Sequence, residues 1–345
     1  IPGNPGIASL GTCVPGSVED NEFIVDFIQK NQIDLTVIGP EVPLCNGLAD
    51  DIEKAGYKAF GPQKKAATLE GSKAFSKDFM IRHHIPTAKY VEVTDFEKAC
   101  KEVDHFDFPL VIKADGLAAG KGVVIVENKE DAISTLKDMM VDGALDGAGS
   151  KVVLEEFLTG FECSLLCFTD GKTIVPMVSA KDHKQIFDGN KGPNTGGMGT
   201  YAPAPVLTDA LRDEAMKTIL EPMVAAMEKE GMPYVGCLYA GLMITDEGPK
   251  VVEFNARFGD PETQVVLPLL DSDLGQIMMA CATGTLTADM VKWKDSSAAC
   301  VILASKGYPE TSSKGDVISG DIKQYDTTIV FHSGTKLVGE NYVTN

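Results

Sequence analysis

The sequence is poor in aromatic residues, histidine and positive charge. Among 345 residues there are one Trp and five His, and 31 Lys or Arg stand against 50 Asp or Glu. The resulting formal charge of −19 disfavours general binding to nucleic acid or to an anionic membrane surface. It does not exclude an anionic small molecule, because a local cluster of lysines and backbone amides can outweigh the charge of the whole chain.

Long apolar runs and CxxC pairs are missing as well. No segment approaches the roughly 18–20 apolar residues of a membrane span, and no signal-peptide pattern opens the chain. The eight cysteines lie mostly in apolar stretches, which indicates reduced, buried thiols and a cytoplasmic protein rather than a disulfide framework. With 44% hydrophobic and 23% charged residues, the chain can build the cores of two or three domains.

Short apolar runs alternate with helical segments, which predicts an α/β fold that is α+β in part. We expect strands at residues 34–39, 57–60, 110–113, 123–126, 235–244 and 250–255, and helices at 48–55, 72–84, 128–140, 207–230 and 272–282. The strand–helix–strand order over 34–60 suggests a βαβ unit. Pro222 should kink or divide the helix over 207–230.

Other segments carry weaker expectations. The runs 151–156, 161–168 and 173–179 look like an antiparallel meander, and the polar, glycine-rich stretch 182–200 looks like a loop. The runs 298–304, 328–331 and 336–338 look like strands of a β-rich last part. The chain begins at Ile1 without Met and ends in a strand-like run over 338–344, so we expect both ends to be cut.

A loop of small residues between two strand signals carries two lysines. Its sequence, KADGLAAGKG from Lys113 to Gly122, lets backbone amides approach phosphate oxygens, while Lys113 and Lys121 supply positive charge. It is not a Walker A loop, because Gly116 to Lys121 is one residue too short and Gly122 stands where Ser or Thr is needed. We interpret it as a strand–loop–strand flap over phosphates that includes Gly120; the alternative is a plain glycine-rich turn.

The strand over 250–255 leads into a second polar constellation. Because alternate side chains of a strand share a face, Glu253, Asn255 and Arg257 should project together, while Val252 and Phe254 point into the core. A carboxylate beside a carboxamide oxygen suits Mg²⁺, with Mn²⁺ as the other candidate, and Arg257 could contact a phosphate on the metal. The alternative is an amphipathic strand with a solvated face.

Two further stretches have polar groups at suggestive spacing. After the run 151–156, the backbone of Phe157 and Leu158 could pair with an adenine edge, and Glu162 could accept the ribose hydroxyls; a solvated acidic hairpin is the alternative. In the stretch 182–200, Asp182 could hold an ammonium and Lys184 a carboxylate or phosphate. A lone histidine such as His183 is more often structural, and Asp182, His183 and the remote Glu253 do not form a convincing zinc set.

Two turns lie where open α/β sheets place their ligands, at the carboxyl ends of strands. They are GNPG at 3–6 and GPEVPL at 39–44. As ordinary turns they need no function.

Five motifs occur here in the order of one known family. They are LEGSK (69–73), ADGLAAGKGV (114–123), EEFLTGFE (155–162), DGNKGPNTGGMG (188–199) and NARFGDPETQ (255–264). The chain resembles the phosphoribosylamine–glycine ligase (glycinamide ribonucleotide synthetase) family of ATP-grasp enzymes over essentially its whole length. The resemblance implies a truncated Rossmann-like N-terminal domain at 1–70, an ATP-grasp domain at 71–264 with a mobile flap at about 110–178, and an incomplete β-rich C-terminal domain at 265–345.

The resemblance also implies an activity and a set of site residues. The reaction joins glycine to 5-phosphoribosylamine with ATP, through glycyl phosphate, in de novo purine synthesis. The residues implied for ATP are Lys73, Lys113, Gly120, Lys121, Glu155, Phe157, Leu158 and Glu162, and those for Mg²⁺ or Mn²⁺ are Glu253 and Asn255. Those implied for the substrates are Gly3, Asn4, Gly39, Pro40, Glu41, Asp182, Asn194, Thr195, Gly196, Gly197 and Arg257. Among all of these, Arg257, Asp182 and Lys121 would be catalytic.

The chain departs from the family pattern at three places. The family has a strand and a glycine-rich loop before Gly3 and further strands after Asn345, and its usual DHKR ends here in Gln185, which cannot donate a charged fork. We therefore keep two alternatives, an ATP-binding fragment without turnover and another ATP-grasp carboxylate–amine ligase; the RFGDPE and GPNTGGMG motifs disfavour the second. We expect a monomer with small-molecule partners only.

Overall fold

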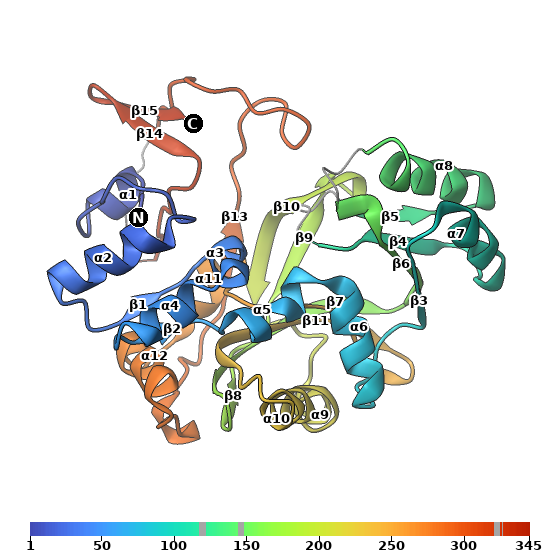
Figure 1. The fold of residues 1–345 in the computed structure, drawn as a ribbon. Helices are drawn as coiled ribbons and strands as arrows, with labels where there is room; N and C mark the ends of the chain where they lie inside the picture. The colour runs from blue at the N-terminus through green and yellow to red at the C-terminus, as the bar shows by residue number, and fades with distance from the viewer. Residues whose placement is uncertain (117–121, 144–147, 321–324, 326) are drawn as a thin grey trace.

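A four-stranded antiparallel sheet in the order β12-β11-β7-β8 lies at the centre of the computed structural model (Figure 1). The structure describes residues 1–116, 122–143, 148–320, 325 and 327–345. The strands of the central sheet are β7 (Phe161–Asp170), β8 (Ile174–Pro176), β11 (Val235–Thr245) and β12 (Gly248–Asn255). The turn at 246–247 joins β11 to β12, between the two strands expected at 235–244 and 250–255.

A second antiparallel sheet in the order β3-β6-β4-β5 forms a separate lobe. Its strands are β3 (Tyr90–Val93), β4 (Leu110–Ala114), β5 (Val123–Val126) and β6 (Val152–Glu156), and it is covered by α7 (Phe96–Glu102) and α8 (Lys129–Met140). The predicted meander over 151–179 is therefore wrong in its first strand, because β6 pairs with β3 and β4 while β7 pairs with β8 and β11. Apolar alternation indicates strands but not their partners.

The stretch 182–200 is a long hairpin rather than the expected loop. Strands β9 (Lys181–Phe187) and β10 (Lys191–Ala202) pair antiparallel, with register shifts on both sides of Asn194. Strand β13 (Ala298–Val301) pairs with the far edge of β10 and so extends this sheet. Backbone hydrogen bonds supply the pairing, which is why the polar composition misled the prediction.

The N-terminal part contains the predicted βαβ unit. Strands β1 (Thr36–Val37) and β2 (Ala59–Phe60) pair in parallel, and the connection holds α3 (Glu41–Asn46) and α4 (Leu48–Lys54). Helices α2 (Asn21–Asn31), α5 (Lys64–Gly71) and α6 (Lys73–Arg82) lie before and after it. The strands are shorter than expected.

The remaining elements complete the molecule. They are α1 (Pro5–Ala8), α9 (Asp209–Ala215), a π-helical turn (Met216–Leu220), α10 (Glu221–Lys229), α11 (Thr263–Val266), α12 (Leu274–Thr283), β14 (Thr335–Val338) and β15 (Asn341–Thr344), with 3-10 turns at 103–105, 148–150, 267–269 and 288–290. The helix over 207–230 is interrupted just before Pro222, as predicted. No strand forms at 328–331, where the structure has a single bridge between Tyr325 and Thr328.

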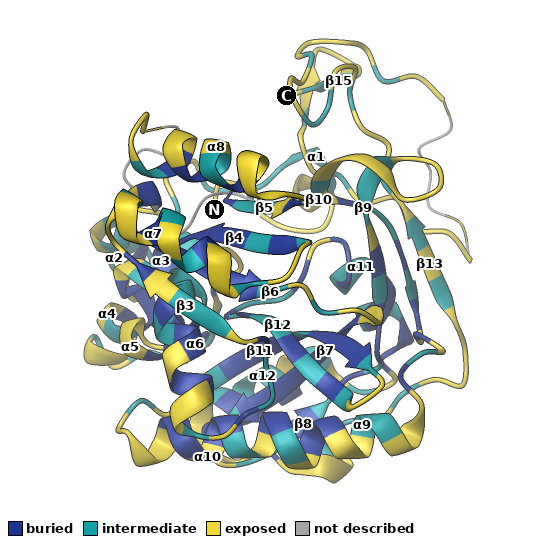
Figure 2. Ribbon diagram, turned by 90° about the vertical axis from the view of Figure 1, so that its right-hand side faces the viewer, coloured by how far each residue is buried: buried dark blue, intermediate teal, exposed yellow. Residues whose placement is uncertain are grey.

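Three apolar clusters hold these parts together. One packs the face of the central sheet that α9, α10 and the N-terminal helices cover, the second packs the other face with α12, and the third fills the lobe under α7 and α8. Figure 2 shows buried strands inside and exposed outer helix faces. Within the described residues, no helix has both the length and the apolar character needed to cross a bilayer.

Helix α6 offers a test of this packing. Phe79 is fully buried whereas Ile81, two residues on, is 52% exposed. We predict that Phe79→Ala lowers the free energy of unfolding by about 3–5 kcal/mol, because it leaves a cavity in the core. Ile81→Ala should stay within about 0.5 kcal/mol. Equal effects in urea unfolding would contradict the placement of the helix face.

Candidate functional site

Glu253 and Asn255 lie on one face of the central sheet, as the strand pattern predicts. The pairing of β12 with β11 places Glu253 opposite Gly241 and Asn255 opposite Tyr239. Phe254 between them is buried in the core on the opposite face. The carboxylate and the carboxamide are therefore neighbours along one strand edge.

The prediction that Val252 points into the core is wrong. The pairing slips between Gly241 and Leu242, which makes Val252 an extra residue in β12. Val251 takes the fully buried core position, and Val252 is only partly buried. This β-bulge changes the side to which the following residues point; without it, Glu253 would share a face with Val251.

Three lysines from separate elements act electrostatically on Glu253. Lys73 begins α6, Lys113 lies in β4 and Lys184 lies in β9. Burial alone would raise the pKa of the Glu253 carboxyl, but these lysines and Arg257 hold that pKa below its usual range. The site therefore keeps an ionised carboxylate inside a group of cations.

Local contacts fix the position of Lys73. Ser72 caps α6 with its hydroxyl and donates to the carboxylate of Asp115 at 3.0 Å. The ammonium of Lys73 donates to the carbonyl of Gly116 at 2.9 Å. The helix start and the residues that enter the predicted phosphate loop are thus tied together. Gly120 and Lys121 lie outside the described residues.

Glu253 and Asn255 fit a divalent cation that is shared with a phosphate ligand. Neither side chain makes a hydrogen bond or ion pair to another described residue, so their oxygens are available. No group of three or more His, Cys, Asp or Glu side chains in the described ranges is arranged to hold a metal. A hard cation with two protein ligands would take its remaining ligands from phosphate and water, which is the usual behaviour of Mg²⁺.

Glu155 forms buried ion pairs with two lysines, Lys77 and Lys113. Its carboxylate is 2.8 Å from the ammonium of Lys77 and 3.0 Å from that of Lys113. Burial lowers the pKa of Lys77 to about 8, against the opposing charge of Glu155. Sequence reasoning missed Lys77, although its position four residues after Lys73 places both on one helix face. A contact between Glu155 and ATP stays a prediction.

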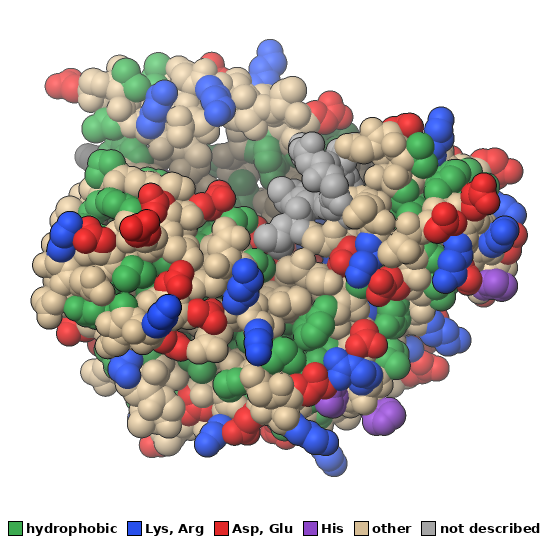
Figure 3. All heavy atoms as spheres, viewed as in Figure 1, with side chains coloured by type: hydrophobic (Ala, Val, Ile, Leu, Met, Phe, Trp, Pro, Cys, Tyr) green, Lys and Arg blue, Asp and Glu red, His purple; other side chains and the backbone are tan. Residues whose placement is uncertain are grey.

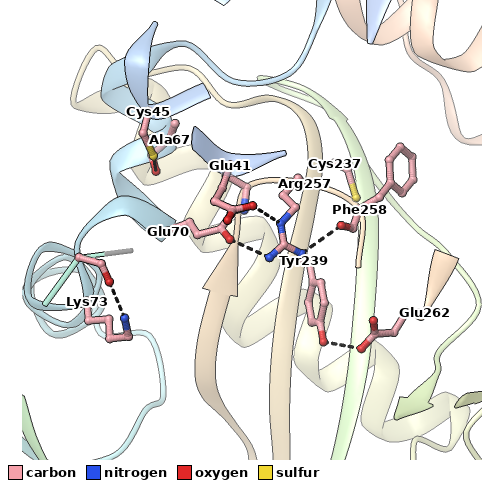
Figure 4. A network of polar contacts seen from close by, with 12 residues as sticks. Glu41, Cys45, Ala67, Glu70, Lys73, Cys237, Tyr239, Arg257, Phe258 and Glu262 are labelled. Atoms are coloured by element: carbon pink, nitrogen blue, oxygen red, sulfur yellow. Dashed lines mark hydrogen bonds and ion pairs between the residues drawn. The ribbon is translucent and has the colours of Figure 1, made fainter. Parts of the chain in front are cut away.

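Arg257 connects the central sheet to the N-terminal part (Figure 4). Its Nε lies 3.2 Å from Glu41 at the start of α3, and its second terminal nitrogen lies 3.1 Å from Glu70 in α5. It also donates to the carbonyl of Phe258 at 3.2 Å. The turn at 39–41 and Arg257, both expected on the substrate side, are therefore brought together.

Glu70 is a candidate site residue that sequence reasoning missed. It also accepts a hydrogen bond from the amide of Ala256 at 2.6 Å. Burial raises the pKa of Glu70 to about 7, although the charge of Arg257 and this amide act in the opposite direction. The available signal was its position three residues before Lys73 in the LEGSK motif.

Asp182 is buried in β9 opposite Thr200, and its side chain has no hydrogen-bond partner in the described part of the chain. Burial disfavours the ammonium of Lys184, but Glu253 and Asp182 outweigh it and hold the pKa of Lys184 above its usual range. His183 is exposed on the other side and contacts the carbonyl of Gly199 at 3.3 Å. A structural role for His183 stays a prediction.

A buried hydrogen-bonded set on the central sheet lies near Asp182, which belongs to the neighbouring β9–β10 sheet. The hydroxyl of Tyr239 donates to the carboxylate of Glu262 at 2.7 Å (Figure 4). The hydroxyl of Ser164 donates to the same oxygen at 3.0 Å. Burial and the charge of Asp182 raise the pKa of Glu262. The set anchors the RFGDPE segment against β7 and β11.

The predicted substrate residues of β10 are held within the hairpin. Thr195 donates to the carbonyl of Lys184 at 2.7 Å and accepts from the amide of Gly197 at 3.0 Å. The amide of Gly196 donates to the hydroxyl of Tyr308 at 3.0 Å. These residues lie one strand away from Lys184, and their contact with substrate stays a prediction.

Asn194 pairs with Gln185 across the hairpin. The side-chain oxygen of Gln185 is buried and has no partner among the described residues. An arginine at this position would place a charged donor here, which glutamine lacks. We therefore still expect a weaker contact with an anion at Gln185 than an arginine would make.

The remaining candidates lie around this centre. Phe157 and Leu158 follow β6 outside any strand, and the exposed Glu162 lies on the Ser164 face of β7. Gly39 and Pro40 immediately precede α3.

Gly3 and Asn4 lie in a different contact group. The side-chain amide of Asn4 donates to the carbonyl of His332 at 2.6 Å, and Gly3 packs on Cys13. This part contacts the β14–β15 hairpin. Figure 3 shows that the surface is hollowed between this region and the lobe with α7 and α8.

Comparison with known proteins places the chain in one family. Models described as the N domain, the ATP-grasp (A) domain and the C domain of phosphoribosylglycinamide synthetase match residues 1–70, 71–263 and 298–345. The chain belongs to the phosphoribosylglycinamide synthetase family. The resemblance inferred from the motifs is confirmed.

Individual relatives support the same assignment. A phosphoribosylamine–glycine ligase from Halalkalibacterium halodurans is 48% identical over 344 residues, covering 100% of this chain and 80% of that protein. The trifunctional purine biosynthetic protein adenosine-3 of Gallus gallus is 49% identical over 349 residues, 100% of this chain but 35% of that protein.

Solved structures support the ATP-grasp fold. The phosphoribosylamine–glycine ligase of Thermotoga maritima superposes with a TM-score of 0.85 at 32% identity, covering 100% of this chain and 82% of that one. A biotin carboxylase from Campylobacter jejuni shares the fold at 17% identity, with a TM-score of 0.69 over 94% of this chain and 74% of that one.

The raised pKa of Glu70 gives a pH-dependent prediction. Folding raises this pKa from 4.5 to about 7, so the folded state takes up a proton between those values. The free energy of unfolding should therefore fall as pH rises across this window, by up to about 3 kcal/mol, and level off above it. Glu70→Gln should flatten this slope in urea unfolding measured from pH 5 to 7.5.

The exposed Glu228 provides the control. Glu228→Gln should leave the slope as in the parent protein, since its carboxylate has only a loose contact with Lys172 at 3.8 Å. A parent-like slope in Glu70→Gln would show that Glu70 is already ionised in the folded state.

Proposed function

We propose that this chain ligates glycine to 5-phosphoribosylamine with consumption of ATP, the reaction for which its relatives are named. The observation that carries the proposal is the convergence of Lys73, Lys113 and Lys184 on the ionised Glu253, in a chain that the family models match in their N, A and C domains. Such a group of cations has the charge to hold a triphosphate.

The chemistry follows from the poor reactivity of a carboxylate. Its oxide is a poor leaving group, so a carboxylate oxygen of glycine first attacks the γ-phosphorus of ATP; ADP leaves and glycyl phosphate forms. The amine of 5-phosphoribosylamine then attacks the acyl carbon, phosphate leaves with the former carboxylate oxygen, and the nitrogen loses a proton. Catalysis is mainly positioning and charge neutralisation.

The nucleotide would lie between the lobe and the central sheet. Lys73 and Lys113 would contact its phosphates, and the backbone of Phe157 and Leu158 would meet adenine. Glu162, on the same sheet face as Ser164, would accept the ribose hydroxyls. This assignment also includes the flap residues Gly120 and Lys121, which rest on the resemblance alone.

Glu253 and Asn255 would hold Mg²⁺ or Mn²⁺, which supplies a Lewis acid that draws charge from the transferring phosphoryl group. The chain's part is to keep Glu253 ionised and its oxygens free. Lys184, which faces the same carboxylate, would help to orient the acyl group.

The acceptor would lie toward Arg257 and the turn at 39–41. Arg257 would contact the sugar phosphate, and Asp182 would attract the amino group of glycine. The residues 194–197 would line the same side, with Gly3 and Asn4 at its outer limit. A monomeric, cytoplasmic protein with small-molecule partners stays our prediction.

The test is ADP release with ATP, Mg²⁺ and glycine, with phosphoribosylamine generated in situ from ribose 5-phosphate and ammonia. We expect release only when glycine and the sugar phosphate are both present. ADP release when glycine or the sugar phosphate is left out would indicate simple ATP hydrolysis. Binding of ATP without any release would support the alternative, a nucleotide-binding fragment.

Glu253→Gln provides the sharper variant. It keeps the shape of the side chain but removes the charge, so we predict about 100-fold slower turnover and a higher Mg²⁺ requirement. Glu228→Gln, on an exposed helix surface, is the matched control and should retain activity. Parent-like turnover of Glu253→Gln at limiting Mg²⁺ would refute the metal assignment.

A further inference from the structure

A buried network of polar groups lies between the lobe and the central sheet, beneath the proposed phosphate site. The ammonium of Lys77 lies 2.8 Å from Glu155 and donates to the hydroxyl of Thr87 at 2.8 Å. Lys113 contacts the same Glu155 oxygen at 3.0 Å. The side chains of both lysines and Glu155 are at most 6% exposed.

The network ends on two successive carbonyls of β12. The hydroxyl of Thr87 donates to the carbonyl of Val251 at 2.8 Å, and Lys113 donates to the carbonyl of Val252 at 3.0 Å. The amide of Val251 donates to the carbonyl of Pro86 at 2.8 Å. Three contacts therefore hold the backbone at Val251 and Val252.

These two residues form the β-bulge that directs Glu253. Val252 is the extra residue, and Glu253 follows it on the face away from Val251. Gly241 opposite leaves the space that the Glu253 side chain uses, since a Cβ there would lie 3.3 Å from its Cγ. A relaxed bulge would move the carboxylate relative to Asn255.

Stability alone does not account for such a network. Burying two ammoniums and a carboxylate costs desolvation energy that an apolar cluster of the same size would avoid. One oxygen of Glu155 is buried without a partner among the described residues, which adds to this cost. Hydrogen bonds and ion pairs are directional, however, so these contacts hold the lysines and Glu155 in one defined arrangement.

We propose that Thr87, Lys77 and Glu155 are positioning residues that fix the β12 bulge and thereby set the geometry of Glu253 for the divalent cation. The inference rests on the proposed function, since it takes Glu253 as a metal ligand. None of the three residues needs to touch the cation or the reacting atoms.

Thr87 allows the cleanest test, because Val has its shape without the hydroxyl and Ser has the hydroxyl without the methyl. The measurement is Mn²⁺ binding at saturating ADP, read from the electron paramagnetic resonance signal of free Mn²⁺. We expect Thr87→Val to raise the Mn²⁺ dissociation constant about fivefold, the equivalent of one lost hydrogen bond. Thr87→Ser should stay within about twofold of the parent.

A matched control separates positioning from general destabilisation. Thr169 is a fully buried threonine of β7 whose hydroxyl donates to the carbonyl of Tyr234 at 3.3 Å. Thr169→Val should lower unfolding stability yet leave Mn²⁺ affinity unchanged. Lys77→Met is a second network variant and should weaken Mn²⁺ binding in the same direction as Thr87→Val.

The outcomes are distinct. Weaker Mn²⁺ binding in Thr87→Val with recovery in Thr87→Ser supports the proposal. Unchanged binding in Thr87→Val, or equal weakening in Thr169→Val, overturns it while the metal site stands. A parent protein that binds no Mn²⁺ with ADP refutes the metal assignment of the proposed function and the inference with it.

Discussion

The attraction between Glu253 and the cations around it is the interaction on which the site depends. Lys73, Lys113 and Lys184 would repel one another if they were brought together alone, and the charge of Glu253 is attracted to all three. Glu155 provides a second negative charge beneath them. Positive charge is thus gathered at one place in a chain whose net charge is −19.

The fold brings these charges from distant parts of the sequence. Lys113 belongs to the lobe, Lys184 to the β9–β10 hairpin and Glu253 to the central sheet. Arg257 then extends the same site to the N-terminal part through Glu41 and Glu70. These contacts join separately packed parts of the fold. The geometry of the site therefore depends on how the lobe, the hairpin, the central sheet and the N-terminal part are placed relative to one another.

Much of this could be predicted from local pattern. The strand over 250–255, the helix beginning near Ser72 and the common face of Glu253 and Asn255 follow from periodicity and capping. The partners of β6, the pairing of the 182–200 hairpin and the bulge at Val252 could not, because backbone pairing with remote strands decides them. Lys77 and Glu70 were missed for the same reason: their meaning depends on neighbours far away in sequence.

We propose that ATP phosphorylates a glycine carboxylate at this cluster of cations. The most direct measurement uses glycine labelled with ¹⁸O in its carboxylate, together with ATP, Mg²⁺ and phosphoribosylamine, and mass spectrometry of the inorganic phosphate. We expect each phosphate released to carry one ¹⁸O atom from glycine. Unlabelled phosphate, with both labelled oxygens left on glycine, would contradict it.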